Sequence, residues 1–169
     1  RLAVSDPTAL GLVGTGPQSI FQLEAALRVR AFEQVKGWNR SSRDLSNHHA
    51  LAESYGVACN EASLEEVVRE SQVIITITSC MEALFPSDWV TPGTHIAAMG
   101  TDTKGKQELD PTLSQRAKRI TDEIAQSRTI GEFQHVSADS EILTIGSILQ
   151  GTATGRTGDN EITAFDGTG

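Results

Sequence analysis

The sequence predicts an α/β fold of the doubly wound kind, with a mainly parallel sheet and helices on both faces. Short apolar runs alternate with amphipathic segments along the chain, and short polar links join them. Apolar residues make up 38% of the chain but aromatic residues only 5%, so the core must be aliphatic, as in a sheet buried on both faces. A glycine turn also separates the first apolar run from the first amphipathic segment. The length of 169 residues suits one domain.

The expected strands are short apolar runs rich in β-branched residues, and the expected helices have apolar residues at helical spacing. We predict strands at 9–13, 34–38, 57–59, 73–77, 94–99, 119–121 and 161–165. We predict helices at 17–30 and 43–55, a short one opened by a capping box at Ser63, and one at 110–117 opened by Asp110. The stretch 151–159 is expected to be a polar, glycine-rich loop.

A phosphate-binding loop is expected between the first strand and the first helix. Its residues are Gly14, Thr15, Gly16, Pro17, Gln18 and Ser19. The first glycine permits a tight turn, the second allows close approach of a pyrophosphate, and the helix N-terminus offers free N–H groups. Ser19 replaces the usual third glycine but is small. A purely structural turn is the alternative, and the strand–loop–helix context favours the Rossmann-type cofactor loop instead.

The end of the second strand is where a dinucleotide-binding domain contacts the adenosine ribose. An acid there is typical of NAD, whereas this chain has Asn39, Arg40 and Ser41. An arginine and a hydroxyl can hold a 2′-phosphate through charge-assisted hydrogen bonds. NADP is therefore favoured over NAD, unless Arg40 and Arg43 only belong to the solvated start of a helix.

Several motifs together resemble the ornithine cyclodeaminase/mu-crystallin family. They occupy 12–18, 38–40, 75–79, 92–96, 99–110 and 161–166, in the family's order and over nearly the whole chain. The stretch 99–110 is the most specific. It is followed by Asp122-Glu123 and Gln126-Ser127, and this combination is most similar to the branch that contains iminosuccinate reductases. One departure is that 136–140 replaces a longer helical stretch of the family, either through trimming or through missing residues.

The resemblance implies a domain organisation that composition does not show. Family members are usually homodimers of chains about twice this length, and segments before and after the Rossmann domain form a substrate and dimerisation domain. Residues 1–169 are therefore expected to be the NAD(P)-binding domain, a fragment that lacks those segments at both ends.

The carboxyl ends of the central strands are where the nicotinamide and the substrate are expected. The cofactor-binding residues expected there are Thr76, Thr78, Ser79 and Met99. The resemblance assigns Asp102 as the catalytic carboxylate, which would stabilise a protonated imine. The alternative is that Asp102 caps a turn before Lys104 and Lys106, which are expected to be solvated.

Three functions remain open at this point. The first is an NAD(P)-dependent imine reductase or amino-acid dehydrogenase acting on a small amino or imino acid. The second is a cyclodeaminase with bound NAD, and the third is a non-catalytic, crystallin-like NADP-binding protein. We expect a cytoplasmic protein.

Other partners and sites are disfavoured by composition. A net charge of −8 and a pI near 4.9 disfavour nucleic acid and anionic membranes as partners. No metal site is expected, since the histidines lack ligand spacing. His95 lies inside a predicted strand and is expected in the core or behind the site rather than as a catalytic residue, and Cys59 and Cys80 are expected to be reduced.

Overall fold

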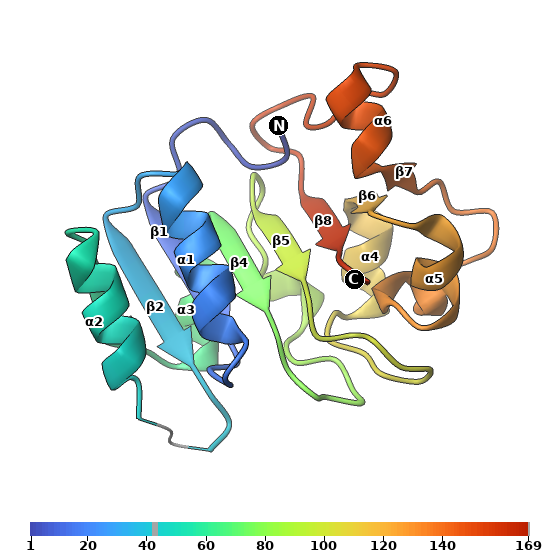
Figure 1. The fold of residues 1–169 in the computed structure, drawn as a ribbon. Coiled ribbons are helices and arrows are strands. Elements are labelled where there is room, and N and C mark those ends of the chain that lie inside the picture. The colour runs from blue at the N-terminus through green and yellow to red at the C-terminus, as the bar shows by residue number, and fades with distance from the viewer. Residues whose placement is uncertain (42–43, 169) are drawn as a thin grey trace.

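The chain folds around one parallel sheet, in a computed structural model that describes residues 1–41 and 44–168. The strand order is β3-β2-β1-β4-β5-β8-β6-β7, and every pairing among the described residues is parallel (Figure 1). Parallel neighbours require crossover connections, and most of the connections here contain a helix. The fold is therefore the doubly wound Rossmann type that the sequence predicts.

The elements follow the alternation of the sequence closely. The strands are β1 (Ala9–Val13), β2 (Gln34–Trp38), β3 (Ala58–Glu61), β4 (Val73–Thr76), β5 (His95–Ala98), β6 (Lys118–Thr121), β7 (Leu143–Thr144) and β8 (Thr163–Asp166). The α-helices are α1 (Ser19–Val29), α2 (Ser46–Ser54), α3 (Leu64–Glu70), α4 (Pro111–Arg116), α5 (Ile124–Thr129) and α6 (Ile145–Gln150). Two 3₁₀ turns, η1 (Ser87–Trp89) and η2 (Glu132–His135), complete the set.

Most predicted elements are confirmed, with shifted ends. The first helix begins at Ser19 because Pro17 and Gln18 form a turn before it. The second helix begins at Ser46, and position 43 lies outside the described residues. The predictions missed α5, β7 and α6, which have six, two and six residues and are too short to show a periodic pattern.

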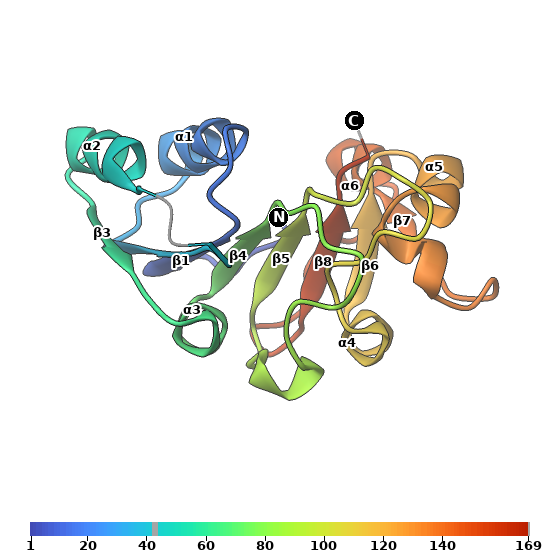
Figure 2. The same ribbon diagram turned by 90° about the horizontal axis from the view of Figure 1, so that it is seen from below.

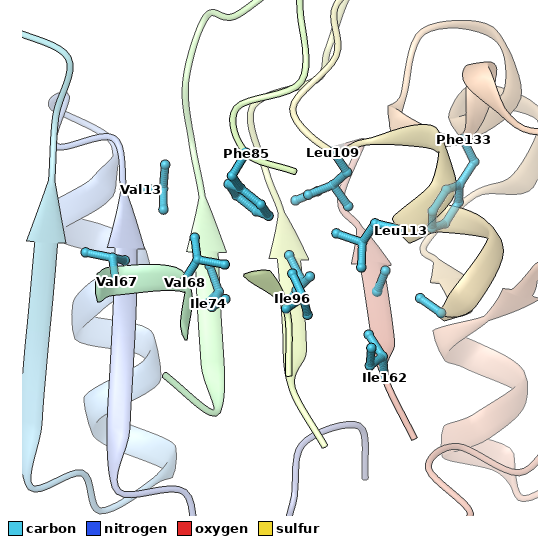
Figure 3. Close-up of a cluster of buried hydrophobic side chains, with 14 of the residues drawn as sticks. Val13, Val67, Val68, Ile74, Phe85, Ile96, Leu109, Leu113, Phe133 and Ile162 are labelled. Atoms are coloured by element: carbon cyan, nitrogen blue, oxygen red, sulfur yellow. The ribbon is translucent and has the colours of Figure 1, made fainter. Parts of the chain in front are cut away.

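Helices cover both faces of the sheet and create two hydrophobic layers. Figure 2 shows α1 and α2 on one face and α3 and α4 on the other. The layer under α3 and α4 is the larger, and Figure 3 shows Val67 and Val68 of α3 beside Ile74 of β4. The opposite layer packs Leu23 and Leu27 of α1 onto the sheet. Both layers are mainly aliphatic, as the low aromatic content leads one to expect, with Phe85 and Phe133 as aromatic members of the larger one.

The order of the strands creates a crevice beside β1. The chain leaves β1 toward β2 and β3, and then returns to form β4 on the other side of β1. The loops that follow β1 and β4 therefore run in opposite directions, which is the switch point where doubly wound sheets bind ligands.

The short segment 136–142 is packed on the rest of the domain. The guanidinium of Arg128 donates to the carbonyl oxygens of Ser137 and Ser140, at 3.2 and 2.6 Å. Val136 and Ile142 contact the larger hydrophobic layer. Over the described residues, no helix is long and apolar enough to cross a membrane, and no group of His, Cys, Asp and Glu has the arrangement of a metal site.

Candidate functional site

A cavity of about 470 Å³ lies at the carboxyl ends of the central strands. It brings together every residue that the sequence suggested for the site except Thr76. The lining residues are Gly14, Thr15, Gly16, Pro17, Gln18, Ser19, Trp38, Asn39, Arg40, Ser41, Ile77, Thr78, Ser79, Cys80, Leu84, Met99, Gly100, Asp102 and Lys106.

The loop after β1 requires glycine at its first position. Gly14 has a φ of +96°, in the left-handed region that favours glycine, and its N–H donates to the carbonyl oxygen of Trp38 at 2.9 Å. A Cβ at Gly14 would collide with the carbonyl oxygen of Ile77 at the end of β4. Two strand ends can meet at the crevice because this position has no side chain.

The N-terminus of α1 is left open toward the cavity. Helices α3 and α4 are each capped by a side chain, from Ser63 and Asp110, whereas none of the described side chains caps α1. The hydroxyl of Thr15 is buried and has no partner among the described residues. A buried hydroxyl and a helix N-terminus without a side-chain cap fit an anionic group such as a pyrophosphate.

Ser19 ties the loop to the second helix. Its hydroxyl donates to the carbonyl oxygen of Gly16 at 2.6 Å, so its oxygen can accept from Nε2 of His48, which lies 2.7 Å away. Both side chains are buried. The sequence indicated only that Ser19 was small enough for the position, and the contact with His48, 29 residues away, was not foreseen.

The ribose side of the cavity contains no acid among the described residues. The Asn39 side chain donates to the carbonyl oxygen of Ser41 at 2.8 Å, and Arg40 is exposed with Nη2 2.8 Å from the Cys80 sulfur. Cys59 and Cys80 are both free thiols, as the sequence predicted. Asp102, which follows β5, is the one acidic residue among the described lining residues.

The ends of β4 and β5 contribute Thr78, Ser79 and Met99 to the cavity. Thr76 does not line it: the residue is fully buried, and its hydroxyl donates to Glu108 at 2.7 Å. His95 lies in β5 and does not line the cavity; it is partly buried and paired with the hydroxyl of Thr163 at 2.8 Å, which supports a structural place rather than a catalytic one.

Asp102 and Lys106 form an ion pair at the mouth of the cavity. The carboxylate is 67% exposed and lies 2.6 Å from the Lys106 ammonium, and this hydrogen bond is the main reason that the pKa of Asp102 is lowered. The expectation that Lys106 is solvated was wrong, because its side chain is only 19% exposed and also lies 3.4 Å from the Gly100 carbonyl oxygen. The turn through Gly105, with a φ of +87°, brings the lysine back. Lys104 is exposed, as expected.

Two buried carboxylates support this region, and the sequence did not single them out. Glu108 accepts from the Thr78 N–H and the Gly100 N–H, at 2.6 and 3.0 Å. Glu132 accepts from the Thr101 hydroxyl at 2.6 Å. Burial raises the pKa of Glu108, and it raises that of Glu132 to about 7. Their only sequence signal was that Glu108 lies inside the family-like stretch.

The chain belongs to the ornithine cyclodeaminase/mu-crystallin family, whose model matches residues 1–169. It is 45% identical to the iminosuccinate reductase of Paracoccus denitrificans over 99% of this chain and 54% of that protein. The crystal structure of that reductase in complex with NAD⁺ matches with a TM-score of 0.93, covering 99% of this chain and 53% of the other. An alanine dehydrogenase of Archaeoglobus fulgidus is 34% identical over 99% of this chain and 54% of that protein. The chain thus spans about half the length of these relatives.

Proposed function

We propose that residues 1–169 are the nicotinamide-dinucleotide-binding domain of an oxidoreductase that acts on the C–N bond of a small amino or imino acid. The observation that carries this proposal is the cavity at the switch point, with a glycine loop at one side and Asp102 at the other. The family relationship supports it, since relatives of this chain are named iminosuccinate reductase and alanine dehydrogenase.

The proposal includes the organisation of the whole protein. The relatives are about twice as long as this chain, which supports a second domain for substrate binding and dimerisation. We therefore propose a cytoplasmic homodimer, with the dimer contacts and the groups that hold the substrate carboxylate in segments other than 1–169.

The glycine loop and α1 would hold the pyrophosphate. The backbone after Gly14 can approach a phosphate closely, the uncapped helix N-terminus attracts its charge, and the Thr15 hydroxyl can donate to it. Thr78, Ser79 and Met99 would flank the nicotinamide, which supplies or accepts a hydride when bound.

Asp102 would act on the nitrogen of the substrate. Hydride adds readily only to a protonated, cationic imine, and an adjacent carboxylate stabilises that cation and can pass a proton to or from it. The lowered pKa of Asp102 keeps the carboxylate charged at neutral pH. Lys106 holds the carboxylate in place through Oδ1, which leaves Oδ2 available to the substrate.

Single-turnover kinetics of Asp102→Asn in the full-length protein test this role. Iminosuccinate is the first substrate to try, because the relative at 45% identity carries that name. The hydride step should slow by about 10²-fold, while the affinity for the cofactor stays unchanged. Asp139→Asn, which neutralises an exposed acid elsewhere, is the control. A slowing of less than about threefold would return Asp102 to a turn-capping role.

The finer proposal is that the cofactor is NADP(H). Support comes from Arg40 and Ser41 at the end of β2 and from the lack of an acid there among the described residues. Comparing kcat/KM for NADPH and NADH tests it, and a preference for NADH of about tenfold or more would contradict it.

A cyclodeaminase is the second candidate, because its name is part of the family's description. Such an enzyme would reduce and reoxidise its bound cofactor within one turnover. Net oxidation of added NAD(P)H by an imino acid distinguishes the two, since only a reductase produces it.

A further inference from the structure

Two buried carboxylates flank the short segment that leads to Asp102. Gly100 is held by the Glu108 side chain, which accepts its N–H at 3.0 Å. Thr101 is fully buried, and its hydroxyl donates to the Glu132 side chain at 2.6 Å. Both residues before Asp102 are therefore fixed by acids that do not line the cavity.

The Glu132 side chain also holds the far end of the same loop. It accepts from the N–H of Glu108 at 3.0 Å and from the N–H of Leu109 at 2.8 Å. One carboxylate thus joins the start of the loop at Thr101 to its end at Glu108. The ion pair of Asp102 and Lys106 lies on the loop between these two points.

A third buried acid fixes the backbone of Glu132. The Asp166 carboxylate at the end of β8 accepts from the Glu132 N–H at 3.0 Å and from the Ser127 hydroxyl. A Cβ at Gly131 would collide with the same carboxylate, so this position must be small. The chain of contacts runs from β8 through Glu132 to the loop that carries Asp102.

We propose that Glu132 is a positioning residue for the reaction, acting through Thr101 and the backbone of 108–109 to hold Asp102 at the nicotinamide side of the cavity. The kinetic part of this inference rests on the proposed function. Burying a side chain with two polar oxygens is costly unless both gain hydrogen bonds, and at Glu132 both oxygens accept from the loop, Oε1 from the Leu109 N–H and Oε2 from the Thr101 hydroxyl and the Glu108 N–H. The three groups that donate to the Glu132 side chain all belong to the loop or its end. We therefore assign Glu132 the role of holding this loop, rather than a general role in core stability.

Glu132→Gln in the full-length protein tests the assignment. The amide keeps the volume, but its NH₂ group would face N–H donors that the carboxylate now accepts. We expect kcat for imine reduction to fall by about tenfold, KM for NAD(P)H to stay within about twofold, and amide hydrogen exchange over 100–109 to become faster. Glu53→Gln, an exposed acid on α2, is the matched control and should leave all three unchanged.

The same substitution in the Asp102→Asn background separates positioning from general loss of structure. If Glu132 acts through Asp102, the second substitution should reduce kcat by less than about twofold further. Independent, multiplying losses would overturn the proposal, as would an unchanged kcat in Glu132→Gln alone.

The Thr101→Val variant and hydrogen exchange test the role of Glu132 independently. If Glu132→Gln does not fold, Thr101→Val removes a single hydrogen bond at nearly constant volume and should give the same loss of kcat at unchanged KM; an unchanged kcat would overturn the proposal. If the wild-type protein reduces no imino acid, the proposed function fails, and hydrogen exchange decides alone. Faster exchange over 100–109 in the variant supports the positioning role, and unchanged exchange overturns it.

Discussion

The two sides of the cavity are formed by different kinds of chemical groups. The phosphate side, 14–19, consists largely of backbone and short side chains, and a side-chain hydrogen bond of Ser19 joins it to His48. The opposite side carries the ion pair of the exposed Asp102 and the partly buried Lys106, and the buried acids Glu108 and Glu132 lie behind it.

This difference in construction determines how much of each side can be predicted from the sequence. The conformation of the glycine loop is determined by residues that are close in sequence, since the end of the strand, the glycines and the start of the helix all lie within 9–19. The side that carries Asp102 depends on contacts between residues far apart in the sequence. Glu132 reaches Thr101 across 31 residues and Leu109 across 23, and Glu108 reaches Thr78 across 30.

Gly16→Asp should have the largest effect, because it places a side chain and a negative charge where the pyrophosphate would lie. We expect the affinity for NAD(P)H to fall by about 10²-fold or more. Gly158→Asp adds the same charge on an exposed loop where a Cβ meets nothing within 4 Å, and it should bind as wild type. Unchanged affinity in a folded Gly16→Asp protein, measured by fluorescence titration, would remove the phosphate loop from the site.

The same contrast explains how much of the molecule could be predicted. Strand and helix alternation, the glycine loop and the capping boundary at Ser63 all come from local chemistry and were predicted. The partly buried Lys106 was missed because the turn at Gly105 that returns it to the cavity depends on packing rather than on spacing. Thr76 does not line the cavity because it is fully buried and its hydroxyl donates to Glu108, a contact across 32 residues that local spacing does not reveal.

The second prediction concerns pH and the buried acid Glu132. Burial raises its pKa from 4.5 to about 7, with the charge of Glu108 adding to the shift, while the hydrogen bond from Thr101 and those from the backbone oppose it. The folded protein thus retains a proton that the unfolded chain loses near pH 4.5. This contribution to stability is fully present below that pH and is lost as pH rises through about 7.

Glu132→Gln lacks this titration, so the free energy of unfolding of wild type minus that of the variant should fall between pH 5 and pH 7. The slope is at most about 1.4 kcal/mol per pH unit. Urea unfolding at a series of pH values measures it. Parallel profiles for the two proteins would show that Glu132 does not change its protonation on folding.

The third prediction tests the ion pair at the other side of the cavity. Lys106→Met removes the main cause of the lowered pKa of Asp102, so that pKa should rise toward its ordinary value. The acidic limb of the kcat profile should move to higher pH, and the hydride step should slow by about tenfold because Asp102 loses its orientation. Lys104→Met, two residues away and exposed, is the control. If both variants behave alike, the pairing with Asp102 has no catalytic role.

The smallest effect is expected at the ribose side of the cavity, where the Arg40 side chain would add one charged contact to a site formed mainly by the backbone. Arg40 is exposed, so its attraction for a 2′-phosphate is screened by water and salt. Arg40→Gln should weaken NADPH binding by about three- to fivefold at low salt, leave NADH binding unchanged, and show a smaller difference at high salt. Arg30→Gln, at the opposite end of α1, removes the same charge and should change neither affinity. Equal losses of affinity for NADPH and NADH in the Arg40 variant would mean that Arg40 stabilises the loop after β4 through Cys80 and does not contact the 2′-phosphate. The cofactor would then be bound on this side without any charged side chain.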